Sequence, residues 1–233
     1  LAGGGDELLG APNTAIQPGD AAPKAPYPLR VKDADGRTVY VVTAPGDYLY
    51  LGQLEAVFDS AGEVLRIGAA SGPRRVMGSG YVDGVGEDTA VRRLAVDPVF
   101  AYSTALATTR VGTSDVGLVG VRDSVRSRQT NLGSLSTDAL LWQAHRVAGA
   151  FGVDSARIAI QNGGGIRNNG VVPAGDLSMA TVFDIHPFGN LLSILPRTKA
   201  TTLKDALENA VRLLPAPSGA FAQIAGAQMW IDT

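Results

Sequence analysis

Apolar and polar positions divide the chain into a β-rich first part and a second part in which strands and helices alternate. Residues 1–30 have little periodicity and many Pro, Gly, Asn and Asp residues, which predicts a long loop. Alternation then predicts strands at 39–43, 48–59 and 63–68, with a turn at 59–62 joining the last two. We therefore expect the first part to be the β-rich edge of a domain.

A helical pattern over residues 88–107 separates the two parts, and Pro98 leaves open whether it forms two helices or one kinked helix. Beyond residue 110 the rhythm is βαβ, which is typical of α/β folds. Leu135 and Trp142 lie near one face of an amphipathic helix in this part. The predicted strands are 116–121, 157–161, 190–196 and 221–231, and the predicted helices are 132–149, 177–183 and 202–213, the last opened by a capping box at Thr202.

Composition narrows the class of protein. The chain has 233 residues, of which 45% are hydrophobic and 18% charged, as in a folded globular protein. A net charge of -2 argues against non-specific binding of nucleic acid, and the absence of Cys excludes disulfides and thiolate metal sites. No apolar run approaches the roughly 18 residues of a membrane span. Because the chain opens at Leu1 and stops just after an apolar pattern, we expect it to be a piece of a longer protein.

The glycine run is the first candidate for a binding site. The apolar stretch 156–161 leads into Asn162-Gly163-Gly164-Gly165-Ile166-Arg167, which predicts a buried strand ending in a tight turn. Glycines let a ligand approach the backbone closely and offer bare N–H groups. Asn162 adds a directional hydrogen-bonding group, and Arg167 adds donors suited to an anion. The alternative is a glycine-rich surface turn with a solvated arginine.

Two further arginines predict anion binding. Arg122 and Arg126 precede the helix that is expected to begin near Asn131, so they would lie at its partly positive N-terminal end. Guanidinium groups bind phosphate or carboxylate bidentately, which makes the pair suitable for such a ligand. Surface salt bridging, for example with Asp123, is the alternative.

An aromatic residue supplies a third element. Phe188 lies between Pro187 and Gly189, where it could present a flat face to a base or sugar, or else fill the core. His145 and His186 are too few and too far apart for a metal site, and we expect each to be a helix-end or surface residue. The chain has no Gly-x-Ser-x-Gly elbow, no Walker loop and no Gly-x-Gly-x-x-Gly fingerprint. These residues therefore favour nucleotide or anion recognition over covalent catalysis.

Several motifs in one order carry a family resemblance. Together they resemble the C-terminal, substrate-recognition domain of the 5′-nucleotidase / UDP-sugar hydrolase family, from about residue 110 to the end. The N-terminal segment looks like the closing part of that family's metallophosphatase domain. The motifs are Arg122-x3-Arg126, Gln129-Thr130-Asn131-Leu132-Gly133, Thr137-Asp138-Ala139, the glycine run, Gly175-Asp176-Leu177-Ser178, Pro187-Phe188-Gly189-Asn190, Leu207-Glu208 and Ser218-Gly219-Ala220-Phe221-Ala222-Gln223.

The resemblance implies a two-domain, metal-dependent phosphohydrolase with an α/β fold. Residues 1–75 would be the remnant of the metallophosphatase domain, 76–109 a linking helix region, and 110–233 a truncated four-layer α/β/β/α domain that holds the nucleoside. Two divalent metal ions would be bound by the rest of the N-terminal catalytic domain, which is also the expected partner. No metal and no catalytic residue are expected within this chain, so by itself it should be inactive.

On the matching positions, the resemblance implies a substrate site. Arg122, Arg126 and Arg167 would contact phosphate or the sugar side, Asn162 the base, and Phe188 would stack on one base face. Gly164 would line the same site. The family's second stacking aromatic would lie beyond the end of this chain, so nucleotide binding should be weak. The residues leave open the choice among mononucleotides, UDP-sugars, cyclic nucleotides and other phosphoesters.

The metal loop departs from the family. Gly5 stands where a metal-binding His is usual, and Glu7 is only a possible substitute ligand. This departure favours an alternative in which the intact protein is a non-catalytic nucleotide-binding surface or adhesion protein. A third interpretation treats the motif residues as packing remnants. The family also implies a periplasmic, cell-surface or secreted location.

Overall fold

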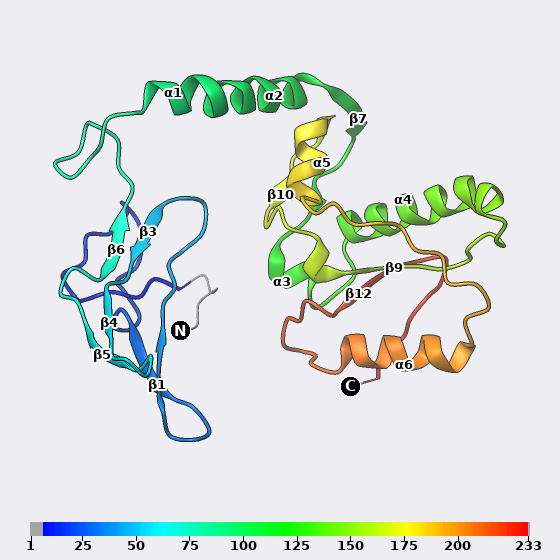
Figure 1. Ribbon diagram of the computed structural model, residues 1–233. Coiled ribbons are helices and arrows are strands. Elements are labelled where there is room, and N and C mark those ends of the chain that lie inside the picture. The colour runs from blue at the N-terminus through cyan, green and yellow to red at the C-terminus, as the bar shows by residue number, and fades with distance from the viewer. Residues whose placement is uncertain (1–6, 233) are drawn as a thin grey trace. The chain divides into compact units, whose positions relative to one another are not determined.

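The computed structural model describes residues 7–232. The chain divides into two compact units, residues 1–95 and 96–233, whose elements are labelled in Figure 1. Gly5 and its neighbours, which the resemblance places at a metal-ligand loop, lie outside the described residues. Glu7 is described, and its carboxylate forms an exposed ion pair with Lys24 at 2.5 Å.

Three antiparallel strand pairs build the first unit. Strand β1 (Leu29–Lys32) pairs with β2 (Thr38–Val41), β3 (Tyr50–Gln53) with β6 (Gly72–Arg75), and β4 (Ala56–Phe58) with β5 (Val64–Ile67). The predicted turn at 59–62 is present, with the Asp59 carboxylate accepting from the backbone N–H groups of Ala61 and Glu63 at 2.9 Å each. Gly62 closes it with a φ of 83°, which glycine adopts without strain.

The long strand predicted at 48–59 is wrong in detail. The segment forms two strands, β3 and β4. Strand β3 pairs with β6 whereas β4 pairs with β5, so the chain changes its pairing partner near Glu55. The Glu55 N–H donates to the Ser71 hydroxyl at 2.9 Å at this break. Strands β1 and β6 were not predicted, since neither segment alternates clearly.

Tyr50 is a buried residue of the first unit that makes two hydrogen bonds through its hydroxyl. Its side chain is only 8% exposed, and its hydroxyl donates to Asp20 at 2.5 Å while accepting from the Gln17 N–H at 2.7 Å. Burial and the Asp20 carboxylate raise the pKa of this phenol. Strand β3 is thereby tied to the irregular N-terminal segment.

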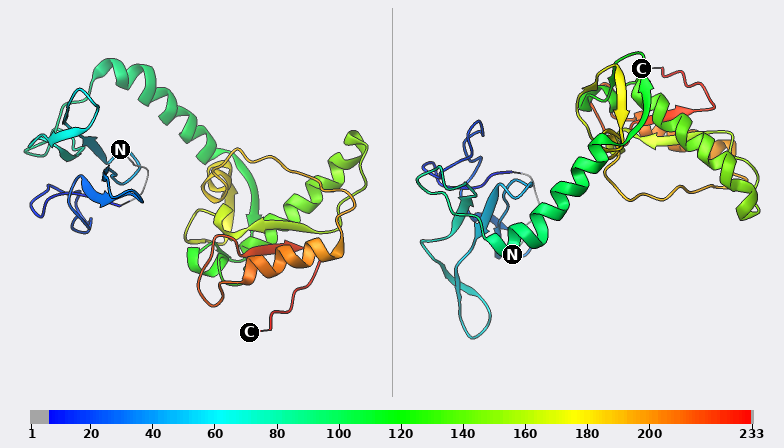
Figure 2. Two further views of the ribbon diagram at one scale, coloured as in Figure 1. Left: turned by 60° about the horizontal axis from the view of Figure 1, so that its bottom comes forward. Right: turned by 90° about the horizontal axis from the view of Figure 1, so that it is seen from above.

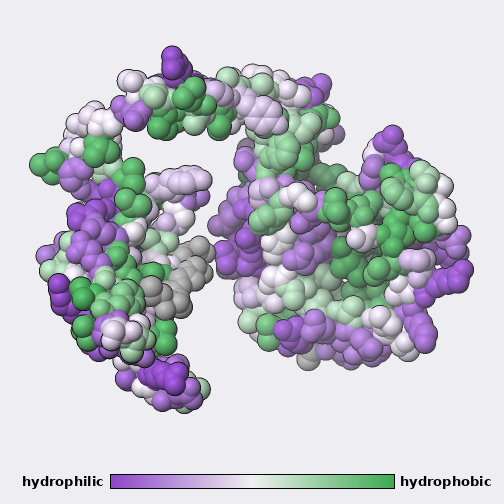
Figure 3. Space-filling view, in the orientation of Figure 1, coloured by the Kyte–Doolittle hydropathy of each residue, from purple (hydrophilic) through white to green (hydrophobic). Residues whose placement is uncertain are grey.

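The predicted helix at 88–107 is present as three consecutive helical segments. These are α1 (Thr89–Val91), a π-helical turn at Arg92–Val96, and α2 (Asp97–Thr108). Asp88 caps the start by accepting from the N–H groups of the first turn, and Pro98 lies where a helix tolerates it, in the first turn of α2. Apolar side chains such as Phe100 (72% exposed) lie on its surface, and Figure 3 shows them in green along the helix.

The second unit is a mixed α/β structure, which confirms the predicted fold class. Its strand pairs are β7 (Arg110–Ser114) with β11 (Gly175–Ser178), β8 (Leu118–Val119) with β10 (Val171–Val172), and β9 (Ala159–Asn162) with β12 (Ala222–Ala225). Although the βαβ rhythm suggests parallel strands, every strand pair within residues 7–232 is antiparallel. The β9–β12 pair lies between α4 (Asn131–Ala148) and α6 (Ala200–Val211) in Figures 1 and 2.

The main core lies where α4 meets the glycine turn and helix α5 (Met179–Ile185). Five buried residues form it: Leu118, Val125, Leu132, Ile166 and Ile185. The buried face of α4 differs from the expected one. Leu135 and Trp142 are 47% and 59% exposed, whereas Leu132, Ser136 and Ala144 are buried, since the strands pack against the neighbouring face.

Four elements of the second unit differ from prediction. Residues 190–196 form no strand, and the pattern at 221–231 yields only β12. The helix predicted from Thr202 begins at Ala200 with Lys199 at its N-cap, so the supposed capping box lies inside the helix. The helix predicted at 177–183 starts at Met179, where the Ser178 hydroxyl accepts from the Thr181 N–H at 3.1 Å. Among residues 7–232, no helix is long and apolar enough to cross a membrane.

Candidate functional site

The glycine run forms a tight turn directly after β9, as predicted. Gly163–Gly165 make one 3₁₀ turn. The Gly163 N–H donates to the Phe221 carbonyl at 2.7 Å and the Gly164 N–H to the Gly219 carbonyl at 3.0 Å. The expectation that these N–H groups are bare is therefore wrong for both residues, because the turn uses them to hold the segment that leads into β12.

Glycine is required in this turn by close packing. A Cβ at Gly163 would lie 2.1 Å from the Val125 carbonyl oxygen, whereas one at Gly164 would meet nothing closer than 3.1 Å. The absence of a side chain at Gly163 lets the turn lie directly against helix α3 (Arg122–Val125). This contact brings Arg167, just after the turn, to the helix that carries the other two arginines.

Arg122, Arg126 and Arg167 form a cationic cluster. Arg122 is the first residue of α3 and Arg126 its C-cap, so the pair lies on its own short helix rather than in the first turn of α4, which Thr130 caps. Burial and the charges of Arg122 and Arg167 lower the pKa of the Arg126 guanidinium, and Asp123 opposes them only weakly. The buried Nε of Arg126 has no hydrogen-bond partner. Like charges gathered around an unpaired donor are an arrangement that an anion would stabilise.

Phe188 lies next to this cluster. The guanidinium carbon of Arg167 is 5.0 Å from the centroid of the Phe188 ring, which is a cation–π distance. The ring is 48% exposed, so it does not fill the core as one interpretation held. The Arg167 N–H donates to the Ile185 carbonyl at 3.0 Å, which holds the residue after the glycine turn against the end of α5.

Asn162 and Gly164 lie just before Arg167, and both donate to the Gly219 carbonyl. The exposed Asn162 amide donates to the Gly219 carbonyl at 3.2 Å, and its oxygen accepts from Gln161 at 3.1 Å. An amide has further donor and acceptor capacity beyond these two bonds. The structure thus brings the three arginines and Phe188 together, and it places Asn162 at the start of the same turn.

Gln223 supports the site and was not predicted to have a role. It is completely buried in β12, and its amide donates to the carbonyls of Val125 at 2.9 Å and Arg128 at 2.8 Å. Its oxygen accepts from the Thr130 N–H at 3.1 Å. The segment that carries Arg126 is therefore fastened to β12 by one side chain. A lone Gln in a strand pattern gives no sign of this, because the partner groups are backbone atoms distant in sequence.

Comparison with known proteins gives the family. The family described as "5'-nucleotidase, C-terminal domain" matches residues 110–233, which is more than half of the chain. The chain belongs to this family. The resemblance inferred from the motifs is thereby confirmed.

Individual relatives agree with the family assignment. The trifunctional nucleotide phosphoesterase protein YfkN of Bacillus subtilis (strain 168) is 41% identical over 117 residues, covering 50% of this chain and 7% of that protein. The snake venom 5'-nucleotidase of Macrovipera lebetinus is 28% identical over 226 residues, covering 94% of this chain and 52% of that one. The crystal structure of a 5'-nucleotidase precursor from Thermus thermophilus matches 96% of this chain and 40% of its own, with a TM-score of 0.55 and 32% identity. The chain thus spans about half or less of the length of each relative.

The resemblance places the two divalent metals in the rest of the N-terminal catalytic domain, outside this chain. Within residues 7–232, no group of three or more His, Cys, Asp or Glu side chains is arranged to hold a metal ion.

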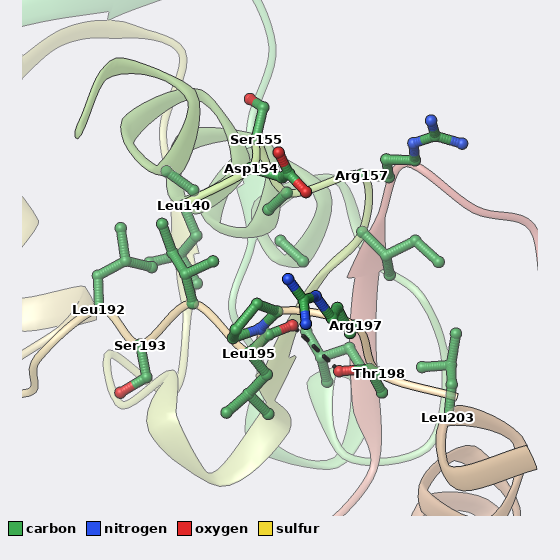
Figure 4. A pocket seen from close by; sticks show the side chains of 17 residues that line it. Leu140, Asp154, Ser155, Arg157, Leu192, Ser193, Leu195, Arg197, Thr198 and Leu203 are labelled. Carbon is green, nitrogen blue, oxygen red and sulfur yellow. Dashed lines mark hydrogen bonds between the residues drawn. The ribbon is translucent and has the colours of Figure 1, made fainter. Parts of the chain in front are cut away.

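A separate cavity of about 570 Å³ lies elsewhere in the second unit. Its walls come from α4, from residues 154–160 and from residues 192–198, and none of the predicted site residues lines it. Figure 4 shows its mostly apolar side chains, with the Thr198 hydroxyl donating to the Leu195 carbonyl at 3.1 Å beside it. The segment predicted as a strand at 190–196 contributes one wall. Arg157 and Arg197 are its cationic lining residues, and Asp154 lines it as well.

Proposed function

We propose that this chain is the nucleotide-recognition portion of a metal-dependent 5'-nucleotidase-type phosphohydrolase that hydrolyses phosphoester bonds of nucleotides. The observation that carries the proposal is the buried, unpaired Nε of Arg126, whose guanidinium group is repelled by the charges of Arg122 and Arg167. A phosphate placed there would supply the missing acceptor and relieve the repulsion among the three guanidinium groups. The family assignment and the names of the relatives support a nucleotide as the source of that phosphate.

The remaining site residues contact different parts of the nucleotide. Phe188 offers an exposed ring for stacking on the base, and the Asn162 amide offers hydrogen bonds to the base edge. Gly164 keeps the turn between them free of side chains. In this assignment the arginines determine affinity for the phosphate, whereas Phe188 and Asn162 determine affinity for the nucleoside.

The chain binds and orients the substrate, and the hydrolytic chemistry is assigned elsewhere. Two divalent metals, held by a metallophosphatase domain, would supply an activated water and polarise the phosphate. We propose that residues 1–75 are the closing part of that domain and that 76–109 link it to the recognition domain 110–233. In support, the compact units divide at residue 95, inside the proposed linking region.

The alternatives carry different expectations. A non-catalytic binding protein would lack the metal ligands in the remainder of the polypeptide, and Gly5 is the residue that favours it. The names of the relatives favour the hydrolase. If the motif residues were packing remnants, Arg126 would be expected to have a partner for its buried Nε, which it lacks.

Calorimetry with AMP tests the proposal. The 233-residue chain should bind AMP weakly, Arg167→Ala should abolish the binding, and no phosphate should be released when Mn²⁺ or Zn²⁺ is added. Arg146→Ala is a matched control, because Arg146 lies 4.6 Å from the Trp142 ring on α4 in a similar cation–π contact outside the site. Equal AMP binding by wild type and Arg167→Ala would show that the site is assigned wrongly. Turnover by the pure chain would contradict the division of labour.

We also propose that the intact protein is exported to a periplasm, a cell surface or the medium. The family resemblance supports this, and one relative is named as a venom protein. Detection of the protein by antibody in fractionated cells of its native host tests the location. A purely cytoplasmic signal would contradict it.

A further inference from the structure

His186 lies where three parts of the site meet. It is the C-cap of α5 and directly precedes Pro187 and Phe188. Its ring nitrogen Nε2 is 2.9 Å from the hydroxyl of Ser136, a buried residue of α4. The ring also lies close enough to the backbone of Gly165, in the glycine turn, for that backbone to raise its pKa. One side chain thus connects α4, the glycine turn and the loop that carries Phe188.

The neutral ring suits both contacts. The nearby backbone of Gly165 raises the pKa of His186, which favours an N–H on the ring nitrogen that faces it. The other nitrogen of a neutral imidazole can then accept from the Ser136 hydroxyl. Burial is the larger influence and lowers the pKa overall, which keeps the ring neutral near pH 7. Both polar partners are satisfied by a ring that needs no charge.

The loop after His186 has few other attachments. Residues 187–194 are described, and none of them makes a hydrogen bond. Phe188 contacts the Arg167 guanidinium, but that contact alone does not orient the backbone. The last hydrogen-bonded residue before Phe188 is His186, whose own N–H donates to the Val182 carbonyl at 2.9 Å. The direction in which Phe188 leaves the helix is therefore set at His186.

We propose that His186 is a positioning residue that, through Ser136 and Gly165, holds the Phe188 loop against the glycine turn and so makes the ring available for base stacking. The inference rests on the proposed function, because it assigns to His186 the nucleoside part of nucleotide recognition. Recognition of the nucleoside is thereby separate from recognition of the phosphate, which is carried out by the arginines. His186 itself touches neither base nor phosphate in this assignment.

A comparison of two ligands tests the proposal. AMP carries a base, whereas ribose 5-phosphate carries only the sugar and phosphate. His186→Leu should weaken AMP about tenfold, the contribution expected of one stacked base, and should leave ribose 5-phosphate affinity unchanged. Phe188→Ala should show the same pattern. The double variant should lose no more than either single variant, because His186 acts only through Phe188.

Two further variants keep the test decisive if His186→Leu folds poorly. His186→Gln retains a donor and an acceptor and should keep most of the AMP affinity. Ser136→Ala removes one of the two attachments and should give a partial loss confined to AMP. Equal losses for AMP and ribose 5-phosphate, additive losses in the double variant, or unchanged AMP affinity in His186→Leu would each overturn the proposal. If the wild type binds neither ligand, the proposed function itself fails, which is a distinguishable result.

Discussion

Gln223→Leu is expected to destabilise the second unit strongly. The substitution keeps the approximate size of the side chain but removes three hydrogen bonds, to the carbonyls of Val125 and Arg128 and from the Thr130 N–H. Val125 is 0% and Thr130 8% exposed, so water cannot easily replace the lost partner at either residue. Arg128 is exposed, and its carbonyl can bind water instead.

The magnitude follows from those two buried groups. Leaving a buried donor or acceptor unsatisfied costs about 1–3 kcal/mol, so the two together predict a loss of about 4 kcal/mol in the free energy of unfolding. The matched control is Gln129→Leu, because Gln129 is exposed and donates to Ser134 at 2.9 Å and to the Ile224 carbonyl at 3.2 Å. Its loss should be below about 1 kcal/mol.

Urea unfolding, monitored by tryptophan fluorescence, measures this difference for the second structural unit. The sequence has two Trp residues, Trp142 and Trp230, and both lie within residues 96–233. Their signal therefore reports the second unit even if the first unfolds separately. If Gln223→Leu proved no more destabilising than Gln129→Leu, the fastening of the Arg126 segment to β12 would have no energetic importance, and the account of how the site is positioned would be wrong.

Three other outcomes are expected. Gly163→Ala should lower the free energy of unfolding by about 2 kcal/mol or more in the same urea assay, because the new Cβ would meet the Val125 carbonyl. Gly164→Ala should lower it less. Equal losses of stability in the two variants would contradict the close packing at Gly163. Burial lowers the pKa of His186 below 6.5, so the unfolded chain takes up a proton at a higher pH than the folded chain does. The free energy of unfolding should therefore decrease as the pH falls from about 7.5 to about 5.5, and it should decrease less in His186→Leu. The same pH dependence in both proteins would contradict this. Burial and the Asp20 carboxylate raise the pKa of Tyr50 above 10.0, so the stability of the first unit should decline as the pH rises past that value. Circular dichroism follows this decline. If Tyr50→Phe showed the same decline, other groups would be responsible for it.

Local sequence patterns predicted the individual elements of the site better than the contacts that bring these elements together. The strand before the glycine turn could be predicted because an apolar run meets three glycines, and both signals lie within about ten residues of each other. The proximity of Arg126 to Arg167 depends on the turn packing against the Val125 carbonyl, a contact between residues far apart in sequence. No local pattern encodes that contact, although the order of the family motifs implied it.

The errors have the same origin. Residues 190–196, which are rich in Leu and Ile, were predicted to form a strand, yet Leu191 and Leu195 are 91% and 77% exposed and no described strand pairs with the segment. An apolar run marks a segment that could pair, but a strand also requires a neighbouring strand with which to pair. His186 was expected to be a helix-end or surface residue. It does end a helix, but its buried contacts with Ser136 and Gly165 could be found only in three dimensions.

The Arg126→Met variant tests the central claim most directly. Because the three guanidinium groups repel one another, removing the Arg126 charge should leave the unfolding free energy the same or higher, while AMP binding is lost. Calorimetry with AMP and urea unfolding of the same preparation measure both quantities, with Arg146→Ala as the control. Retained AMP affinity together with a loss of stability would show that Arg126 is a packing residue and would contradict the nucleotide site.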